Sequence, residues 1–268
     1  MRRAFFGRGL FPAATLCVTA AVQTAAGSAV AQDEPPAEWS FTLGGGGMYA
    51  PDYEGSDDYS VMPLPFVEVS WRDRIRLSGL GIYATPFMTD GLRFDLGVRY
   101  DFGRYEDDND ALKGLGDLEV GAVAVVRLGY EAGPVSLGLE VARDLTGDRN
   151  GLTATAEAEY GIELLDDVRL NVKPHLTWAD DEYMSNTFGI TAARAARSAR
   201  GLASYDAGSG LKDVGIDLGI GYMMTDSIYV MGQVGYSRLL GDAADSPLVD
   251  DEGSADQLSA MLGLTYRW

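Results

Sequence analysis

Apolar and polar residues alternate with a period of two along most of the chain. The last segment is a clear example, because apolar side chains fall on one face and polar ones on the other. The apolar face holds Leu258, Ala260, Leu262, Leu264, Tyr266 and Trp268, and the polar face holds Gln257, Ser259, Gly263, Thr265 and Arg267. Successive side chains of a β-strand point to opposite faces, so the pattern predicts a strand with one apolar and one polar side.

Eleven runs of this kind follow one another. They cover 39–49, 61–70, 74–84, 91–102, 117–130, 134–145, 151–163, 167–178, 211–224, 227–239 and 256–268. Most have about ten or more residues, which suits a tilted strand crossing a membrane, whereas soluble strands average about 5–6. After residue 31 no stretch is apolar for the ~18 residues that a membrane-spanning helix needs.

One strand is missing from this count. Bacterial single-chain membrane barrels have an even number of strands, and Pro63, Pro65 and Pro86 weaken the pattern between residues 60 and 90. We therefore expect a missed or split strand in that region. The prediction is an all-β fold, an antiparallel up-and-down transmembrane β-barrel of about 12 strands.

The connections between the runs alternate in length, which favours a barrel over a soluble sandwich. Short turns lie at Met88–Gly91, Ala132–Pro134, Leu164–Asp167 and Thr225–Ser227, and long polar segments lie at Gly103–Gly116, Ala179–Gly210 and Gly241–Ala255. Outer-membrane barrels have short periplasmic turns and long external loops. A closed barrel also pairs every backbone group without leaving an edge in lipid.

Both ends of the chain indicate export to the outer membrane. Arg2, Arg3 and Arg8 precede an apolar, alanine-rich stretch that ends in Ala29-Val30-Ala31. This is the pattern of a signal peptide, and we expect residues 1–31 to be cleaved after Ala31, leaving a barrel domain of residues 32–268. The last strand ends on the aromatic Trp268, which resembles the C-terminal signal that the barrel-assembly machinery recognises.

The charge and the cysteine content exclude several classes of function. All 40 acidic residues follow Ala31, whereas three of the 21 basic residues precede it, so 18 basic residues remain and the net charge is −22. Such an acidic chain repels nucleic acid phosphates, and we expect no nucleic-acid binding. Cys17 is the only cysteine and lies in the signal peptide, so the mature chain has no disulfide and no cysteine nucleophile.

The polar faces of the strands carry full charges of both signs. If these faces point inward, the candidate lumen-lining residues are Arg93, Asp95, Arg99, Asp101, Arg169, Lys173, His175, Asp213 and Asp217. Two interpretations stay open. The charges line a conducting pore, or they neutralise one another in a plugged barrel, and a twelve-strand barrel is wide enough for either.

Other candidate sites are better explained by structure than by chemistry. His175 is the only histidine and lies mid-strand, so we expect a hydrogen-bonding role in the lumen rather than catalysis. Gly44–Gly47 lacks the Gly-Lys-Ser/Thr ending of a phosphate-binding loop. We expect no catalytic, cofactor-binding or metal-binding residues, and we interpret the chain as a protein that is not an enzyme.

Two loop segments are rich in charge. The acidic clusters Asp107-Asp108, Asp110 and Asp250-Asp251-Glu252 lack the spacing of a calcium loop, so we interpret them as solvated external loops rather than as sites for calcium or for cation-bridged lipopolysaccharide. The stretch Ala192–Arg200 predicts a short basic helix. We expect it to fold into the barrel mouth and pair with lumen acids; the alternative is that it lies on top.

Several short motifs, in order along the mature chain, resemble the MipA/OmpV family of outer-membrane barrels. They are Pro51-Asp52-Tyr53-Glu54-Gly55-Ser56, Pro63-Leu64-Pro65, Phe102-Gly103-Arg104, Phe188-Gly189-Ile190-Thr191, Ala199-Arg200-Gly201-Leu202 with Tyr205, Arg238-Leu239, and Asp242-Ala243-Ala244-Asp245-Ser246-Pro247-Leu248-Val249. The Asp-Ser-Pro-Leu-Val stretch is the most specific of these. The terminal Trp268 departs from the family, which more often ends in Phe.

The resemblance implies a function that the residues alone do not. It implies a scaffold named for interaction with a murein lytic transglycosylase and acting between that enzyme and a murein synthase. Some members of the family are described as porin-like, so a narrow channel for small solutes is the alternative. Outer-membrane lipid, lipopolysaccharide and the barrel-assembly machinery are the other partners expected of such a protein.

Overall fold

The computed structural model describes residues 38–268, which form one closed antiparallel β-barrel. Its strands are β1 (Trp39–Pro51), β2 (Tyr59–Trp71), β3 (Ile75–Ser78), β4 (Gly81–Met88), β5 (Leu92–Asp101), β6 (Gly121–Ala132), β7 (Val135–Asp144), β8 (Leu152–Leu165), β9 (Val168–Ala179), β10 (Gly210–Met223), β11 (Ile228–Leu239) and β12 (Asp256–Arg267). The predicted signal peptide lies outside the described residues.

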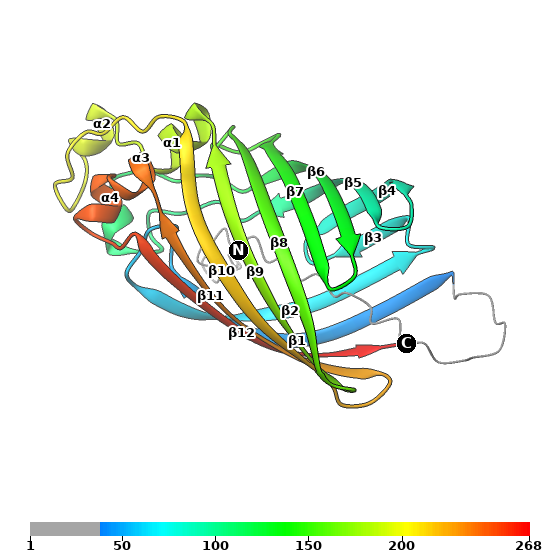
Figure 1. The fold of residues 1–268 in the computed structure, drawn as a ribbon. Coiled ribbons are helices and arrows are strands. Elements are labelled where there is room, and N and C mark those ends of the chain that lie inside the picture. The colour runs from blue at the N-terminus through cyan, green and yellow to red at the C-terminus, as the bar shows by residue number, and fades with distance from the viewer. Residues whose placement is uncertain (1–37) are drawn as a thin grey trace, which may run out of the picture.

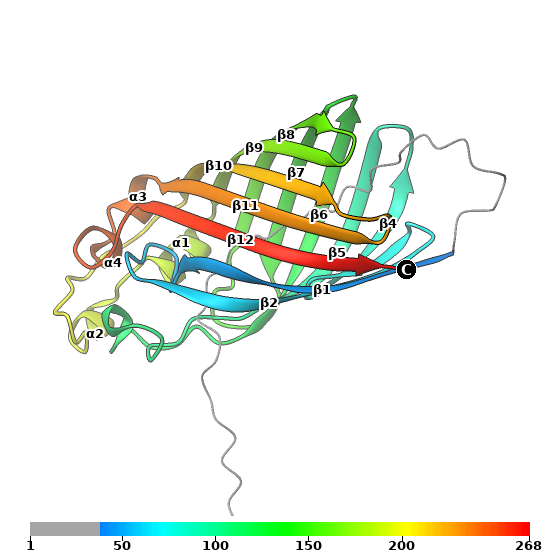
Figure 2. The same ribbon diagram turned by 90° about the horizontal axis from the view of Figure 1, so that it is seen from below.

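Each strand pairs with the next along the chain, and β1 closes the ring by pairing with β12. The closing pair joins Leu43 to Tyr266 and Tyr49 to Ala260, and Figure 2 shows β12 lying beside β1. The predicted fold, an up-and-down antiparallel barrel of twelve strands, is confirmed. None of the helices within residues 38–268 is long and apolar enough to cross a bilayer.

The outer wall is apolar, as the alternation predicted. Leu218, Leu262 and Val234 expose 53%, 65% and 55% of their surface, because lipid rather than protein surrounds them. Aromatic pairs mark both rims of this belt: Tyr266–Trp268 and Trp39–Phe41 lie at the end with the short turns, and Tyr49–Tyr59 and Tyr100–Phe102 lie toward the loops. Such aromatic girdles are typical of outer-membrane barrels.

The region between residues 60 and 90 contains the strand that the sequence pattern missed. The run predicted as one strand at 74–84 is wrong: it is a tight hairpin in which β3 turns at Gly79-Leu80 into β4. Gly79 has a φ of +57°, which glycine adopts without steric cost. β3 pairs with only the last four residues of β2, from Glu68 to Trp71.

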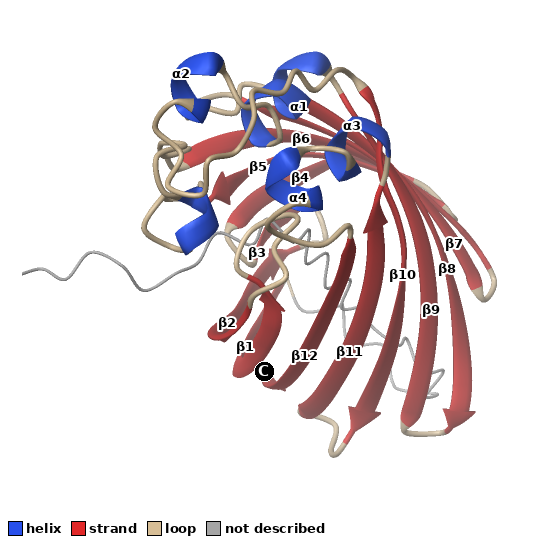
Figure 3. Ribbon diagram, turned by 90° about the vertical axis from the view of Figure 1, so that its left-hand side faces the viewer, coloured by secondary structure: helices blue, strands red, loops and turns tan. Residues whose placement is uncertain are grey.

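The long connections fold into a cap over one end of the barrel. They contain α1 (Asp181–Thr187), α2 (Ala192–Ala195), α3 (Gly241–Ala244), α4 (Pro247–Asp250) and a 3-10 turn at Asp110–Leu112. Figure 1 shows α1–α4 gathered at the end opposite to the C-terminus, and Figure 3 shows them grouped across the barrel mouth. We refer to this loop assembly as the cap.

The cap holds the two largest buried apolar clusters of the described chain. One cluster packs Met184, Phe188, Ala243 and Val249 with four neighbours. The other packs residues from four different connections, namely Tyr53, Ala111, Leu112, Leu115, Ile190, Leu202 and Leu248. The long polar segments predicted as loops therefore contain the part of the molecule that most resembles the core of a soluble protein.

Candidate functional site

The lumen is a cavity of about 1770 Å³ that extends from the short turns to the underside of the cap. At the turn end its lining includes Asp73, Pro134 and Asp166, and at the cap end it includes Glu54 and Tyr183. The candidate residues selected from the alternation all line this cavity: Arg93, Asp95, Arg99, Asp101, Arg169, Lys173, His175, Asp213 and Asp217.

One group of lumen charges surrounds Asp95 on β5. Arg93 Nε lies 2.9 Å from Asp95 Oδ2, and the hydroxyl of Thr85 on β4 donates a hydrogen bond to the same carboxylate. Arg76 on β3 is the second cation, but its Nη2 is 4.0 Å from Asp95 Oδ2. Asp95 is therefore fully partnered, whereas the guanidinium of Arg76 has only this distant carboxylate and a cation–π contact with Tyr83, whose ring centre lies 5.6 Å away.

A second group has Glu140 of β7 between two arginines. Arg99 Nη1 of β5 lies 2.7 Å from Glu140 Oε1, and Arg127 Nε of β6 donates to Glu140 Oε2. The guanidinium of Arg127 also lies over the ring of Tyr83, 4.8 Å from its centre, in a cation–π contact. The Tyr83 ring fits because Gly97 faces it and a Cβ there would collide with it.

A third group surrounds His175 of β9. His175 Nε2 lies 3.5 Å from Asp213 Oδ1, and Nδ1 lies 3.7 Å from Asp217 Oδ2. Asp217 also lies 3.8 Å from Lys173 Nζ and accepts a hydrogen bond from the amide of Gln233. These contacts make His175 part of a carboxylate network that crosses from β9 to β10 and β11.

A β-bulge brings a further cation into the lumen. By strict alternation Lys212 belongs on the outer face of β10 with Val214, but the register shifts between Leu211 and Asp213. Lys212 and Asp213 consequently both point inward, and Lys212 Nζ lies 2.6 Å from Asp213 Oδ2. A bulge inserts one extra residue and so reorients the side chain beside it.

Lys212 joins the barrel wall to the cap. Its ammonium forms an ion pair with Glu54 of the β1–β2 loop, and Glu54 Oε2 accepts a hydrogen bond of 3.0 Å from the hydroxyl of Tyr183 in α1. Burial and the neighbouring Glu54 raise the pKa of Tyr183, so its hydroxyl stays a donor. One strand, one loop and one helix thus meet at the partly buried carboxylate of Glu54.

Two arginines fasten the cap at other points. Arg149 Nη1 lies 2.7 Å from Asp101 Oδ2 at the top of β5. Arg104 Nη1 donates a 2.9 Å hydrogen bond to the carbonyl oxygen of Thr187 at the end of α1. Both side chains are buried. Burial, with Arg149 and Arg194 nearby, lowers the pKa of Arg104 to about 10, and the residue is still charged at neutral pH.

One sector of the lumen wall lacks charge along most of its length. Met48 of β1, Met261 of β12, and Met62, Leu64 and Phe66 of β2 all line the cavity. Phe66 packs against Gly263 of β12, where a Cβ would collide with the ring. The lumen therefore has an apolar side formed by β12, β1 and β2, next to the arginines of β3, β5 and β6.

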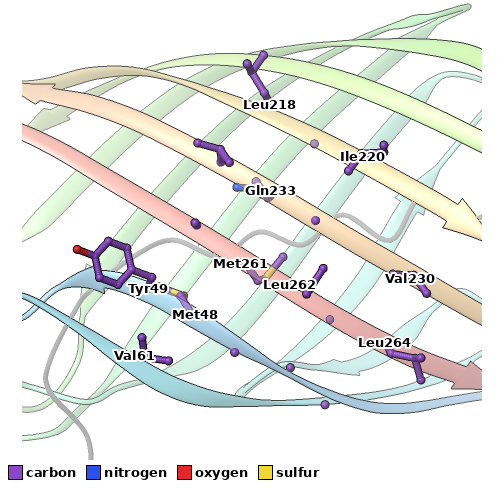
Figure 4. A pocket seen from close by; sticks show the side chains of 18 of the residues that line it. Met48, Tyr49, Val61, Leu218, Ile220, Val230, Gln233, Met261, Leu262 and Leu264 are labelled. Carbon is purple, nitrogen blue, oxygen red and sulfur yellow. The ribbon is translucent and has the colours of Figure 1, made fainter.

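A separate depression lies over β1, β10, β11 and β12 and is lined mostly by apolar and small residues, with the polar Gln233 among them. Its edges are formed by Tyr49, Val61, Leu218 and Leu264, as Figure 4 shows. Gly45 and Gly47 lie at its floor, where the absence of side chains lowers the surface. No charged residue lines it.

The charged loop segments lie in and on the cap. The basic stretch Ala192–Arg200 contains α2, but the expectation that it pairs with lumen acids is wrong. Arg200 pairs with Glu252 of the β11–β12 loop at 3.2 Å, and Arg194 donates to the carbonyl oxygen of Gly189. Within residues 38–268 no cluster of three or more His, Cys, Asp or Glu side chains is placed to hold a metal ion.

The family of the chain follows from comparison with known proteins. Residues 43–268 match the family described as MltA-interacting protein MipA. The chain belongs to the MipA family. Together with the closed strand barrel, this makes it an outer-membrane β-barrel protein. Among curated proteins none matches the chain.

Several solved structures are similar to this MipA-family chain at low sequence identity. A NanC porin is 12% identical, with 84% of this chain and 98% of that chain covered and a TM-score of 0.48. An outer membrane channel of the COG4313 group from Pseudomonas putida F1 is 11% identical, with coverages of 88% and 100% and a TM-score of 0.43. OmpT of Vibrio cholerae is 9% identical, with coverages of 86% and 98% and a TM-score of 0.37. None of these likenesses bears on function.

Several residues of the lumen network were absent from the sequence-based selection. Arg127 and Glu140 occupy the inward positions of β6 and β7, and the same period of two identifies them once every strand is searched. Lys212 and Glu54 could not be found in this way, because a bulge positions the first and a folded loop the second.

Proposed function

We propose that this MipA-family barrel is a structural scaffold that holds a murein lytic transglycosylase, together with a murein synthase, at the inner surface of the outer membrane. The family description supports an interaction with the transglycosylase MltA. On this proposal the protein has no catalytic role of its own, and the enzymes that it holds carry out the chemistry.

The observation that carries the proposal is the folded cap. Two buried apolar clusters and the ion pairs of Lys212 and Arg149 tie the long loops to the barrel top. By the usual orientation of outer-membrane barrels these loops face outward and the short turns face the periplasm. A barrel closed on its outer side is better suited to holding partners at its inner rim than to passing solutes.

The periplasmic rim offers a charged docking surface for such partners. The short turns carry the exposed acids Asp90, Asp166, Asp167 and Asp226. Charges at the rim of an interface chiefly steer association and choose partners. We propose that a basic surface of the transglycosylase contacts these turns. We also propose that lipid and lipopolysaccharide surround the wall. In the same proposal the signal peptide is cleaved after Ala31, and the barrel-assembly machinery recognises Trp268.

Charge reversal at the rim tests the scaffold. The double variant Asp166→Lys, Asp167→Lys should recover at least about tenfold less transglycosylase from solubilised envelopes than the unaltered barrel does. The matched control is Asp250→Lys, Asp251→Lys, which reverses two exposed acids on the opposite, external side and should leave recovery unchanged. Recovery of no murein enzyme by the unaltered barrel contradicts the proposal.

A narrow porin-like channel is the second candidate, favoured by the size and charge of the lumen. Planar-bilayer recordings of refolded residues 32–268 separate the two functions. The scaffold predicts a folded barrel without discrete conductance steps. Steps that change in ion selectivity with Arg99→Glu would instead establish a pore through the lumen, because Arg99 lines the cavity.

A further inference from the structure

The barrel wall is incomplete beside β2. β2 pairs with β1 along its whole length, from Tyr59 to Trp71, but it pairs with β3 only from Glu68 onward. Among the described residues, no backbone hydrogen bond joins Ser60–Val67 to any segment except β1. At about 3.3 Å per residue this unpaired edge is roughly 25 Å long.

Folded segments of the chain bound the opening at both of its ends. The β3–β4 turn bounds it toward the periplasm, and there the backbone N–H of Tyr100 donates to the carbonyl oxygen of Leu80 at 3.0 Å. Toward the cap, the amide of Asn109 donates to the carboxylates of Asp52 and Asp58. Figure 1 shows the short β3–β4 hairpin confined to the end of the barrel away from the helices. We name this opening the β2 window.

Two prolines determine what can occupy the window. Pro63 and Pro65 lie within the unpaired edge, and proline has no N–H to donate to a neighbouring strand. Prolines on an edge prevent the addition of a further strand. They also remove two donors that would otherwise face lipid without partners. The window therefore suits an acyl chain, which needs no backbone hydrogen bonds, and not a β-strand of a partner protein.

The lumen lies directly behind the unpaired edge of β2. The residues that line the cavity include Leu64 and Phe66, whose side chains face inward from this edge. Leu80 and Tyr100 lie on the other side of the window and also line the cavity. At the window β2 is therefore apolar on both faces, with Pro63 and Pro65 toward the lipid and Leu64 and Phe66 toward the lumen.

A cationic group lies just inside the window. Arg76 of β3 lines the cavity next to the β3–β4 turn, and Arg93, Arg99 and Arg127 line the wall beyond it. Arg93, Arg99 and Arg127 each have a close carboxylate partner. The guanidinium of Arg76 lies 4.0 Å from the carboxylate of Asp95 and 5.6 Å from the centre of the Tyr83 ring, and 28% of the side chain is exposed. Arg76 can therefore bind a further anion.

We propose that the β2 window is a lateral port through which an amphiphile with an acyl chain and an anionic head group enters the lumen from the membrane. The acyl chain lies against Leu64 and Phe66, and the head group is bound by Arg76. A free fatty acid and an anionic phospholipid share this chemistry. The inference is independent of the proposed scaffold role, because it rests on the wall and not on the periplasmic rim.

Site-directed fluorescence tests lateral entry. The mature chain contains no cysteine, so a fluorophore can be attached at Leu64→Cys beside the window or at Thr155→Cys on β8 as the matched control. Both positions line the lumen. In phosphatidylcholine vesicles that contain chain-nitroxide phosphatidylglycerol or chain-nitroxide stearic acid, we expect several-fold stronger quenching at position 64. Equal quenching at both positions, or none at position 64 with either probe, overturns the port.

The two probes also separate the two sources of the amphiphile. Quenching by stearic acid alone identifies a free fatty acid, quenching by phosphatidylglycerol alone identifies a phospholipid, and quenching by both supports the shared chemistry. Heat-modifiability on gels shows whether each variant is folded, so that only folded barrels are compared.

The head-group contact is tested in the Leu64→Cys background. Arg76→Gln should raise the concentration of nitroxide stearic acid needed for half-quenching by about tenfold, because a charge-assisted contact is lost. Nitroxide methyl stearate, which has no charge, should quench Arg76→Gln and its parent equally. Arg169→Gln, which removes a lumen arginine of β9, should change neither response. Equal effects of Arg76→Gln on the acid and the ester overturn the assignment of Arg76.

Discussion

The cap and the strand wall of this protein use the same apolar residues in opposite ways. Leu248 in the cap exposes 1% of its surface, whereas Leu262 in the wall exposes 65%. In the cap, apolar side chains pack on one another and exclude water, as in a soluble domain. In the wall they face lipid, and the strands are held together by backbone hydrogen bonds between neighbours. A truncated side chain should therefore matter far more in the cap than in the wall.

Phe188→Ala should have the largest effect. Phe188 is fully buried in the cap, and its truncation should cost about 3–5 kcal/mol of local stability because a cavity is left behind. We expect much faster protease cleavage within the β9–β10 loop of the refolded protein, while the barrel itself stays folded. The control is Leu262→Ala, whose lost atoms face lipid. Equal cleavage rates in the two variants would contradict the comparison.

Glu54→Gln should have an intermediate effect, because it weakens the junction between cap and wall. Lys212 would lose one of its two carboxylates and keep Asp213 at 2.6 Å. A buried polar group that loses one partner costs about 1–3 kcal/mol. Hydrogen exchange of α1 measures this loss as faster exchange. Glu38→Gln, which removes the exposed pair with Arg72 at the turn end, should leave exchange in α1 unchanged.

Arg99→Gln should have the smallest effect, because Glu140 in the lumen keeps Arg127 as a partner. Pairs that water can reach contribute about 0–1 kcal/mol, so the free energy of unfolding in urea should change little. The double variant Arg99→Gln, Arg127→Gln leaves Glu140 without either arginine and should cost clearly more. If Arg99→Gln lowers the free energy of unfolding as much as the double variant does, water does not reach these lumen pairs, and the contrast between lumen and cap is contradicted.

The wall was accessible to sequence reasoning because its information is local. A strand places every second side chain on the same face, so Ile216 outside and Asp217 inside follow from the order of residues alone. The lengths of the connections likewise separated the turn end from the loop end. The run at 74–84 failed because a two-residue turn inside it, Gly79-Leu80, leaves the alternation almost undisturbed.

The cap was not accessible in the same way. Nothing local in the sequence relates Tyr53, Leu112, Ile190 and Leu248, which come from four connections and meet in one cluster. The basic stretch at Ala192–Arg200 looked suited to lumen acids, yet its Arg200 found Glu252 in a neighbouring loop. Its partner depends on how several loops pack, which no periodicity encodes.

The order of residues alone specifies that the chain forms an antiparallel barrel, which faces of its strands meet lipid, and which family it resembles. These follow from the period of two and from short motifs, and both are properties of neighbouring residues. Three features emerge only in the folded barrel: Lys212 turns inward at a bulge, the loops close one end, and β2 is left with a free edge beside a short β3. These depend on register and on contacts between distant segments, which form only when the ring of strands closes.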